Sequence, residues 1–145
     1  MSWTLRPATL ADLEHLAELR AVVMRPDLER LGRYDAQRVR QRLRDAFAPE
    51  HTQIIEVDGE PAGSVSMRPA EDGRWLEHFY LDPRHQGRGL GTAVLRSVLK
   101  DADADSATVR LNVLQGSPAR KLYERHGFVV DGEDPVDVFM VRKFL

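Results

Sequence analysis

The 145-residue sequence contains no cysteine, and this absence excludes several kinds of site. The chain cannot form a disulfide, a thiolate metal site, an iron–sulfur cluster or a cysteinyl acyl-enzyme. Basic residues are not in excess either, because 21 lysines and arginines stand against 23 aspartates and glutamates and the formal charge is -2. Binding to a nucleic-acid backbone is therefore disfavoured as the main activity.

Long apolar runs and linkers are also missing. No hydrophobic stretch approaches the length of a membrane span, and no Ser/Gly-rich or low-complexity segment divides the chain. The five histidines show no metal-ligand spacing, so no metal site is expected. Hydrophobic residues make up 42% of the sequence, which suits one domain over residues 1–145 with a buried core. We therefore expect a cytoplasmic, single-domain protein that binds neither membranes nor nucleic acid.

Apolar periodicity and turn residues predict an α/β fold with a mixed sheet, in the order β-α-α-β-β-β-α-β-α-β-β. An Asp58-Gly59 dipeptide predicts a tight hairpin turn. Residues 101–106 are predicted to be a polar turn after a helix that ends at Lys100. Strands are expected over 3–6, 53–57, 62–67, 75–81, 108–113, 128–130 and 136–144, and helices from residue 9 toward Met24 before Pro26, from an Asp35 cap through Phe47, over 90–100 and over 118–126.

A glycine cluster, Gln86-Gly87-Arg88-Gly89-Leu90-Gly91, lies directly between a predicted strand and a predicted helix. Glycines allow backbone dihedrals that other residues avoid, so main-chain N–H groups can approach an anion at the positive end of the helix. Arg84 and Arg88 add positive charge beside these amides. The cluster therefore predicts a binding site for a phosphate-bearing ligand.

Two common phosphate motifs fit this cluster poorly. A Walker A loop needs Lys-Ser/Thr after its last glycine, and no lysine follows Gly91. A dinucleotide fingerprint needs G-x-G-x-x-G and an acid at the end of the next strand, whereas this chain has G-x-G-x-G and Leu111-Asn112-Val113. A turn that merely connects strand to helix is the structural alternative, and the flanking arginines disfavour it.

The segment Leu81–Gly91 resembles the acetyl-coenzyme A signature of the GCN5-related N-acetyltransferases (GNAT), Gln/Arg-x-x-Gly-x-Gly/Ala. Gln86, Gly89 and Gly91 stand at its defined positions. Residues 117–128 resemble the family's second motif, Asn-x-Ala-x-x-Leu-Tyr-x-x-x-Gly-Phe, with serine in place of the asparagine. The resemblance spans the whole chain and implies a GNAT-like mixed, splayed sheet flanked by helices.

This resemblance implies transfer of an acetyl group from acetyl-CoA, as cosubstrate, directly to a primary amine, without a metal. The acceptor would be a small-molecule amine or a protein amine, and the sequence does not identify it. A catalytically silent module that binds coenzyme A or an acyl-CoA is the alternative. An exposed apolar strand near the C-terminus would offer an edge for a homodimer.

The resemblance also implies roles for single residues. The Phe79 N–H would point at the thioester oxygen, and the Leu81 main chain would hold the pantetheine arm. Tyr123 would be the general acid that protonates the thiolate; simple packing of Tyr123 against the sheet is the alternative. The set expected to bind the cofactor is Phe79, Leu81, Arg84, Gln86, Gly87, Arg88, Gly89, Leu90, Gly91, Thr92, Ser117 and Tyr123.

Glu77 is the candidate general base. Strand alternation places its side chain on the same face as Phe79 and Leu81. The segment Leu76–Tyr80 also looks like the corresponding strand of the diamine acetyltransferases, in which a glutamate stands at this place. A solvated glutamate at a strand edge, with ordered water as the base, is the alternative.

Overall fold

The computed structural model describes residues 2–144, which form strands and helices in the predicted order. The strands hydrogen-bond in the order β1-β2-β3-β4-β5-β7-β6. Strands β4 and β5 pair in parallel, and the pairs β1–β2, β2–β3, β5–β7 and β6–β7 are antiparallel. The predicted α/β class with a mixed sheet is therefore confirmed. The strands are β1 (Trp3–Pro7), β2 (Thr52–Val57), β3 (Glu60–Ala70), β4 (Gly73–Leu81), β5 (Thr108–Leu114), β6 (Val129–Glu133) and β7 (Asp137–Arg142), and the helices are α1 (Leu13–Arg30), α2 (Ala36–Ala46), α3 (Leu90–Ala104) and α4 (Ala119–Arg125).

The chain divides into two compact units. The first contains the residues up to Ser66 together with His78–Gly87, and the second contains Met67–Glu77 together with the residues from Arg88 on. Strands β3 and β4 are each shared between the two. The expectation of one domain over residues 1–145 stays a prediction.

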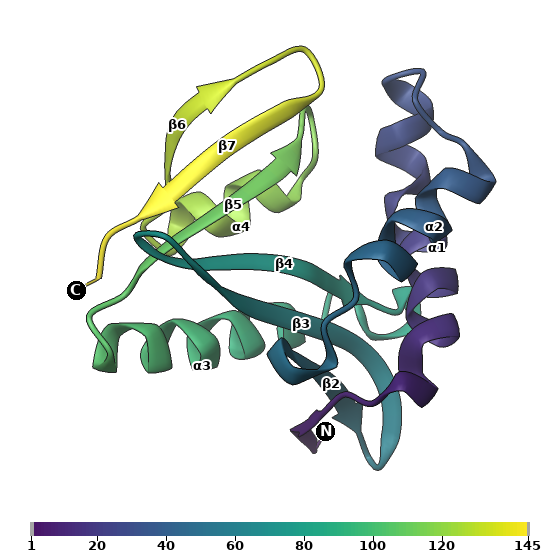
Figure 1. Cartoon of the computed structure of the whole chain (residues 1–145), viewed down its shortest axis with the longest axis horizontal. Coiled ribbons are helices and arrows are strands. Elements are labelled where there is room, and N and C mark those ends of the chain that lie inside the picture. The colour runs from purple at the N-terminus through teal and green to yellow at the C-terminus, as the bar shows by residue number, and fades with distance from the viewer. Residues whose placement is uncertain (1, 145) are drawn as a thin grey trace. The chain divides into compact units, whose positions relative to one another are not determined.

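The first unit is built from the β1–β2–β3 meander, the end of β4 and the helices α1 and α2, which lie side by side (Figure 1). The predicted hairpin turn is confirmed, since Asp58 and Gly59 join β2 to β3 with φ values of 50° and 83°. The buried cluster of this unit draws on both helices and on two strands. Its members are Ala8, Leu16, Ala17, Leu19, Leu43, Ile54 and Tyr80.

The expected end of the first helix before Pro26 is wrong, because α1 continues through the proline to Arg30. A proline removes one backbone donor, but the following turn still forms, and the Leu31 N–H donates to the Asp27 carbonyl at 3.1 Å. The helix stops where Gly32 adopts a φ of 68°. Glycine just past the last helical turn is a common stop signal.

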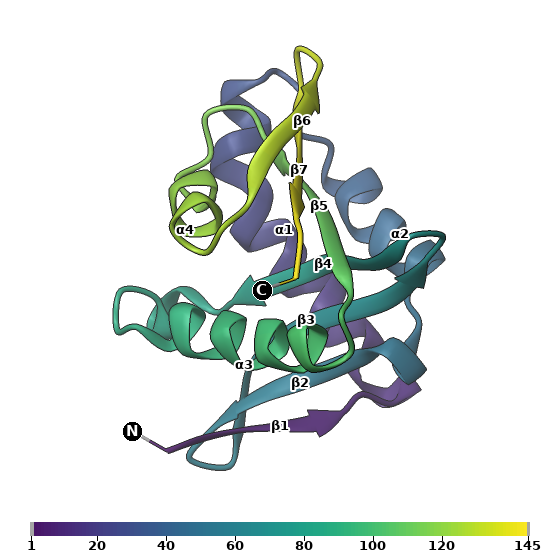
Figure 2. The same ribbon diagram turned by 90° about the vertical axis from the view of Figure 1, so that its left-hand side faces the viewer.

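The second unit is built around the antiparallel pairs β5–β7 and β7–β6 (Figure 2). The first residues of β4, Gly73–Trp75, pair in parallel with β5. The predicted polar turn over residues 101–106 is wrong in its first part, because α3 continues to Ala104. Ala102 is fully buried and extends the apolar face of Leu95, Val98 and Leu99 by one turn, which explains the longer helix.

A buried arginine joins three elements of the second unit. Arg142 of β7 is 5% exposed and forms paired hydrogen bonds to the Asp103 carboxylate of α3, at 2.8 and 2.9 Å. Its Nε donates to the His126 carbonyl at the end of α4, at 2.9 Å. Such paired contacts satisfy the guanidinium inside the unit, where an unpaired charge would be costly.

Candidate functional site

The glycine loop has the backbone conformation that its sequence predicts. After β4 ends at Leu81, a short turn over Pro83–His85 leads to Gly87 and Gly89, whose φ values are 77° and 79°. Residues with a Cβ rarely adopt this left-handed region, so glycine is strongly favoured at both positions. A Cβ at either glycine would meet no other heavy atom of the described residues within 4 Å. Space therefore surrounds the loop backbone.

Helix α3 begins directly after this loop, with Gly89 as its N-terminal cap. The Ala93 N–H donates to the Gly89 carbonyl at 3.0 Å and closes the first turn. The amides of residues 90–92 precede that bond and have no acceptor within the helix. Leu90 is 1% exposed, so its side chain packs inside the protein and does not face a ligand at the loop. Free amides, open glycines and the positive helix end together fit a phosphate group.

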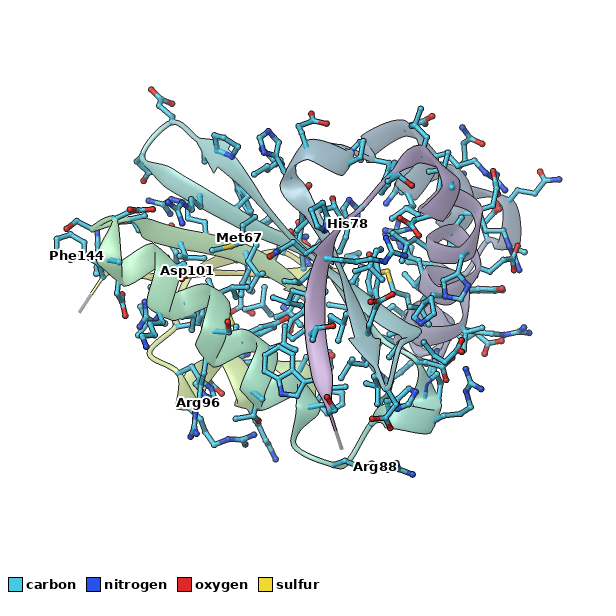
Figure 3. The ribbon with its side chains drawn as sticks, turned by 90° about the horizontal axis from the view of Figure 1, so that it is seen from below. Met67, His78, Arg88, Arg96, Asp101 and Phe144 are labelled. Carbon is cyan, nitrogen blue, oxygen red and sulfur yellow. The ribbon has the colours of Figure 1, made fainter. Side chains whose placement is uncertain are left out.

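The two arginines of the loop differ in their surroundings. Arg84 is paired with Asp82, with Nε 3.1 Å from Oδ1 and Nη2 3.2 Å from Oδ2. This guanidinium and the Arg84 N–H hold the pKa of Asp82 below its usual value, and the Asp82 carboxylate raises the pKa of Arg84. Arg88 is exposed, and its side chain projects outward from the loop (Figure 3). Arg88 is therefore the better placed of the two for a phosphate.

Gln86, expected to contact the cofactor, has a structural partner. Its Nε2 donates to the Leu81 carbonyl at 2.9 Å and ties the loop to the end of β4. The N–H of Asp82, the residue after Leu81, donates to the Ala62 carbonyl of β3 at 2.8 Å. Sequence reasoning missed both contacts, because neither depends on a pattern of neighbouring residues.

Strand β4 is interrupted at His78, whose φ is 47°. Side chains alternate between the faces of a strand only while every residue is extended. The alternation argument that placed Glu77 on the face of Phe79 and Leu81 therefore fails at His78. The role of Glu77 as a base stays a prediction.

Glu77 contacts Arg68 of β3. The Arg68 Nε lies 3.0 Å from Oε1 of Glu77, and the Arg68 guanidinium lies 5.5 Å from the centre of the Trp75 ring. This pair could not be predicted from the sequence, because its members lie on two strands and are nine residues apart. The ion pair with Arg68 gives the Glu77 carboxylate a structural function, so an experiment must decide whether Glu77 also acts as the base.

Tyr123 of α4 is 9% exposed and packs edge to face on Phe128, with 5.6 Å between the ring centres. The Oγ of Ser117, just ahead of α4, accepts a hydrogen bond from the Ala119 N–H at 3.3 Å and so provides an acceptor for an amide at the start of that helix. Both residues lie where the sequence predicts them, with Ser117 just ahead of the fourth helix and Tyr123 within it. Their contacts with a cofactor stay predictions.

The predicted site residues are distributed over both units. Within the first unit, the Gln86–Leu81 hydrogen bond joins two of them directly. Within the second, Gly89, Leu90, Gly91 and Thr92 adjoin one another at the start of α3. The first unit holds Phe79, Leu81, Arg84, Gln86 and Gly87, and the second holds Glu77, Arg88, Gly89, Leu90, Gly91, Thr92, Ser117 and Tyr123.

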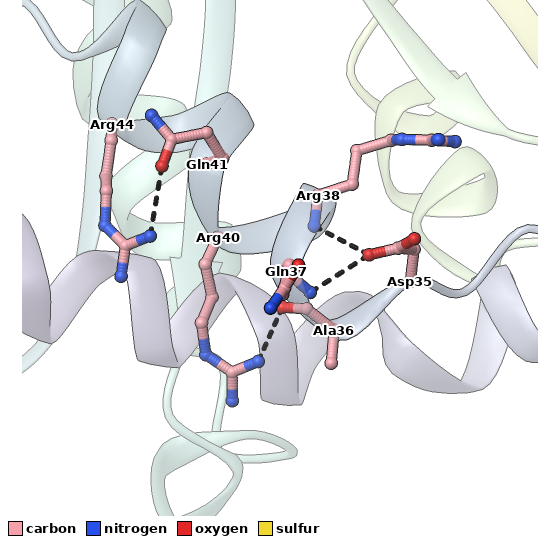
Figure 4. A pocket seen from close by; sticks show the side chains of 7 residues that line it. All are labelled: Asp35, Ala36, Gln37, Arg38, Arg40, Gln41 and Arg44. Carbon is pink, nitrogen blue, oxygen red and sulfur yellow. Dashed lines mark hydrogen bonds between the residues drawn. The ribbon is translucent and has the colours of Figure 1, made fainter.

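A shallow hollow of about 640 Å³ lies along α2 (Figure 4). Two guanidiniums that line it form ion pairs, because Arg40 pairs with Glu18 at 2.9 Å and Arg44 with Glu14 at 3.0 Å. The helix therefore has a solvated charged face, as expected when charges of both signs are interspersed. The hollow is lined by Asp35, Ala36, Gln37, Arg38, Arg40, Gln41 and Arg44.

Residues 2–144 contain neither a metal-ligand cluster nor a membrane-spanning helix. No cluster of three or more His, Cys, Asp or Glu side chains there has the arrangement of a metal site. No helix in the same range is both long and apolar enough to traverse a bilayer.

Comparison with known proteins gives a family match over most of the chain. The sequence model of the acetyltransferase (GNAT) family matches residues 13–128. This range includes the glycine loop and the segment of the second motif up to Phe128.

Two curated proteins match shorter segments. The spermine/spermidine N(1)-acetyltransferase of Bacillus subtilis is 33% identical over 67 residues, 43% of this chain and 44% of the relative. The mycothiol acetyltransferase of Nocardiopsis dassonvillei is 36% identical over 85 residues, 47% of this chain and 26% of the relative. The match thus spans less than half the length of each relative.

A solved structure matches the fold over nearly the whole length. The PaiA N-acetyltransferase of Thermoplasma acidophilum, crystallised with coenzyme A, superimposes with a TM-score of 0.80. The match covers 99% of this chain and 100% of that one, at 21% sequence identity. At this identity the likeness supports the fold.

Proposed function

The chain belongs to the acetyltransferase (GNAT) family, and we propose that it transfers the acetyl group of acetyl-CoA directly to a primary amine. The observation that carries this proposal is the pair of left-handed glycines, Gly87 and Gly89, directly ahead of α3. Open backbone amides at a helix N-terminus suit the pyrophosphate of coenzyme A. A B. subtilis relative named for spermine and spermidine supports an amine as the acceptor.

The reaction requires one bond to form and one to break. The amine nitrogen bonds to the acetyl carbon, the carbon–sulfur bond of the thioester breaks, and the amine loses a proton. A base takes that proton, and a general acid supplies one to the departing thiolate, so that free coenzyme A and an acetylated amine leave. The absence of cysteine favours this direct attack over an acyl-enzyme.

Three groups of this chain would serve these steps. The Phe79 N–H would donate to the thioester oxygen as negative charge develops there. Tyr123 would protonate the thiolate, and Glu77, or water, would accept the amine proton. Backbone amides at Gly89–Thr92 and the Arg88 side chain would hold the phosphates.

A panel of amines tests the proposal directly. The chain is incubated with acetyl-CoA and with spermidine, spermine, an aminoglycoside, a lysine peptide or a peptide with a free N-terminus. We expect coenzyme A release with at least one of them, read with a thiol reagent. Because the protein contains no cysteine, it adds no thiol background of its own.

Calorimetry with acetyl-CoA separates the remaining outcomes. Binding without release under any amine would identify a silent acyl-CoA-binding module. No binding of acetyl-CoA at all would reject both functions, because each depends on the glycine loop.

A Glu77→Gln variant is expected to have a kcat/KM about tenfold below that of the wild type. Glutamine keeps the size of the side chain but cannot accept a proton, so a reaction that uses the carboxylate as its base becomes slower. The measurement is kcat/KM for the best amine at one fixed pH.

Arg68→Gln is the matched control, since it breaks the same ion pair but leaves the Glu77 carboxylate in place. The kcat/KM of this variant should stay within about threefold of the wild type. An equal kcat/KM in Glu77→Gln and in the wild type would assign the pair to structure and leave water as the base.

A further inference from the structure

His78 has an unusual backbone conformation for a residue within a strand. Its φ of 47° lies in the left-handed region, which costs free energy for any residue with a Cβ. Such a conformation persists only where surrounding contacts hold it. Two sets of contacts do so, one to its carbonyl group and one to its ring.

The first contact fixes the peptide group that follows His78. The Oγ of Ser64 donates to the His78 carbonyl at 2.7 Å, and Ser64 is fully buried. The C=O of His78 and the N–H of Phe79 belong to one planar trans peptide, so they point in opposite directions. A hydroxyl that fixes the carbonyl therefore also fixes the direction of the Phe79 N–H.

The second contact is a hydrogen-bond chain that reaches the His78 ring. The Arg20 Nε of α1 donates to the Tyr80 hydroxyl at 3.0 Å, and that hydroxyl lies 3.2 Å from Nδ1 of His78. Tyr80 is 9% exposed and belongs to the buried cluster of the first unit. Because Arg20 can only donate, the Tyr80 proton points to another acceptor, and both Nδ1 of His78 at 3.2 Å and Sδ of Met24 at 3.8 Å lie within reach.

Strand β3 is held close to this part of β4. A Cβ at Gly63 would lie 2.0 Å from the Tyr80 carbonyl oxygen and 3.1 Å from the Leu81 Cα. The backbones therefore approach as closely as glycine permits. Ser64 is the next residue, so this close approach brings its hydroxyl within reach of the His78 carbonyl.

We propose that Ser64, His78, Tyr80 and Arg20 are positioning residues, which together aim the Phe79 N–H at the acetyl carbonyl. Ser64 holds the peptide group, and Arg20 and Tyr80 hold the ring of the left-handed residue before it. The inference rests on the proposed acetyl transfer, in which the Phe79 N–H donates to the thioester oxygen. It assigns no proton transfer to the His78 side chain.

Substitutions at His78 separate backbone conformation from ring chemistry. Glycine adopts the left-handed region without strain, whereas valine is a severe outlier there. We expect His78→Gly to have a kcat about tenfold higher than that of His78→Val, with similar KM values for acetyl-CoA. Equal losses of kcat in the two variants would overturn the proposal, because they would show that the left-handed backbone conformation of residue 78 does not affect the rate.

Substitutions in β3 test the peptide contact. Ser64→Ala removes the hydroxyl that holds the His78 carbonyl and is expected to lower kcat about fivefold at constant KM. Ser66→Ala is the matched control, because this serine is also buried in β3, at 2% exposure. Equal kcat values for the two variants, with any difference confined to the thermal midpoint, would contradict a positioning role.

A measurement without turnover keeps this inference separate from the proposed reaction. The probe is the ketone analogue of acetyl-CoA, which retains the acetyl carbonyl but cannot transfer the acetyl group. We expect its binding to move the Phe79 amide proton downfield relative to coenzyme A alone, and Ser64→Ala to reduce that shift at least twofold.

Failure of the proposed acetyl transfer and failure of the positioning inference would give different results. A Phe79 shift in a wild-type protein that acetylates no amine would reject the proposed reaction and support the positioning of the donor. Turnover without any Phe79 shift would support the reaction and overturn the positioning.

Discussion

The Tyr123→Phe variant is expected to turn over about 100 times more slowly than the wild type, with little change in the Kd of acetyl-CoA. Loss of the hydroxyl would leave the thiolate without a proton donor. The ring itself should stay in place, because phenylalanine preserves the edge-to-face contact with Phe128 at 5.6 Å. Steady-state kcat with the best amine and calorimetric Kd are the two measurements.

Tyr34→Phe is the control for loss of a tyrosine hydroxyl. Its ring is covered by the Arg25 guanidinium, 4.7 Å from the ring centre, and phenylalanine keeps this contact. We expect its kcat to stay within about twofold of the wild type. A lower thermal midpoint at unchanged kcat in Tyr123→Phe would show that the Tyr123 hydroxyl is structural.

Gly63→Ala is expected to lower the free energy of unfolding by about 3 kcal/mol. The added methyl group would lie 2.0 Å from the Tyr80 carbonyl oxygen, so it meets backbone rather than a movable side chain. Relief requires β3 to separate from β4 at residues that hold the buried cluster of the first unit. Urea denaturation followed by circular dichroism measures the loss.

Gly132→Ala is the matched control, since this glycine also lies in a strand, β6, but has no heavy atom of the described residues within 4 Å of a Cβ. Its unfolding free energy should change by less than about 0.5 kcal/mol. Equal stability of the two variants would mean that the approach at Gly63 is less tight than the structure indicates.

The order of elements could be read from the sequence, because it depends on local signals. The Asp58-Gly59 turn and the Asp35 cap act over a few residues, and the cap carboxylate accepts the Gln37 and Arg38 amides at 3.0 and 2.9 Å. The two wrong helix ends have a different cause. Helix α3 continues past Lys100 because Ala102 is buried, a tertiary effect that a polar local composition conceals. Helix α1 continues past Pro26 although its buried residues all precede the proline, so there the helix tolerates the loss of one backbone donor.

The glycine loop was the part of the site that the sequence predicted well, since the positive φ values of Gly87 and Gly89 are a direct consequence of residue type. The conformation of β4 could not be predicted in the same way. His78 is held by Ser64 and Tyr80, and the hydroxyl of Ser64 comes from another strand, 14 residues away. No spacing within β4 encodes that contact, so alternation along the strand could not establish on which face the Glu77 side chain lies.

A hydrogen-bond donor supplied by the main chain cannot be deleted by changing its own side chain. If the Phe79 N–H acts as proposed, other side chains at position 79 should have little effect on the reaction, because each of them except proline keeps the main-chain N–H. Intolerance to mutation then moves to Gly63, Ser64 and His78, which touch the peptide or the strand that holds it. In a saturation mutagenesis library of β3 and β4, we therefore expect activity to fall most for substitutions at these neighbouring positions and less for substitutions of Phe79 itself.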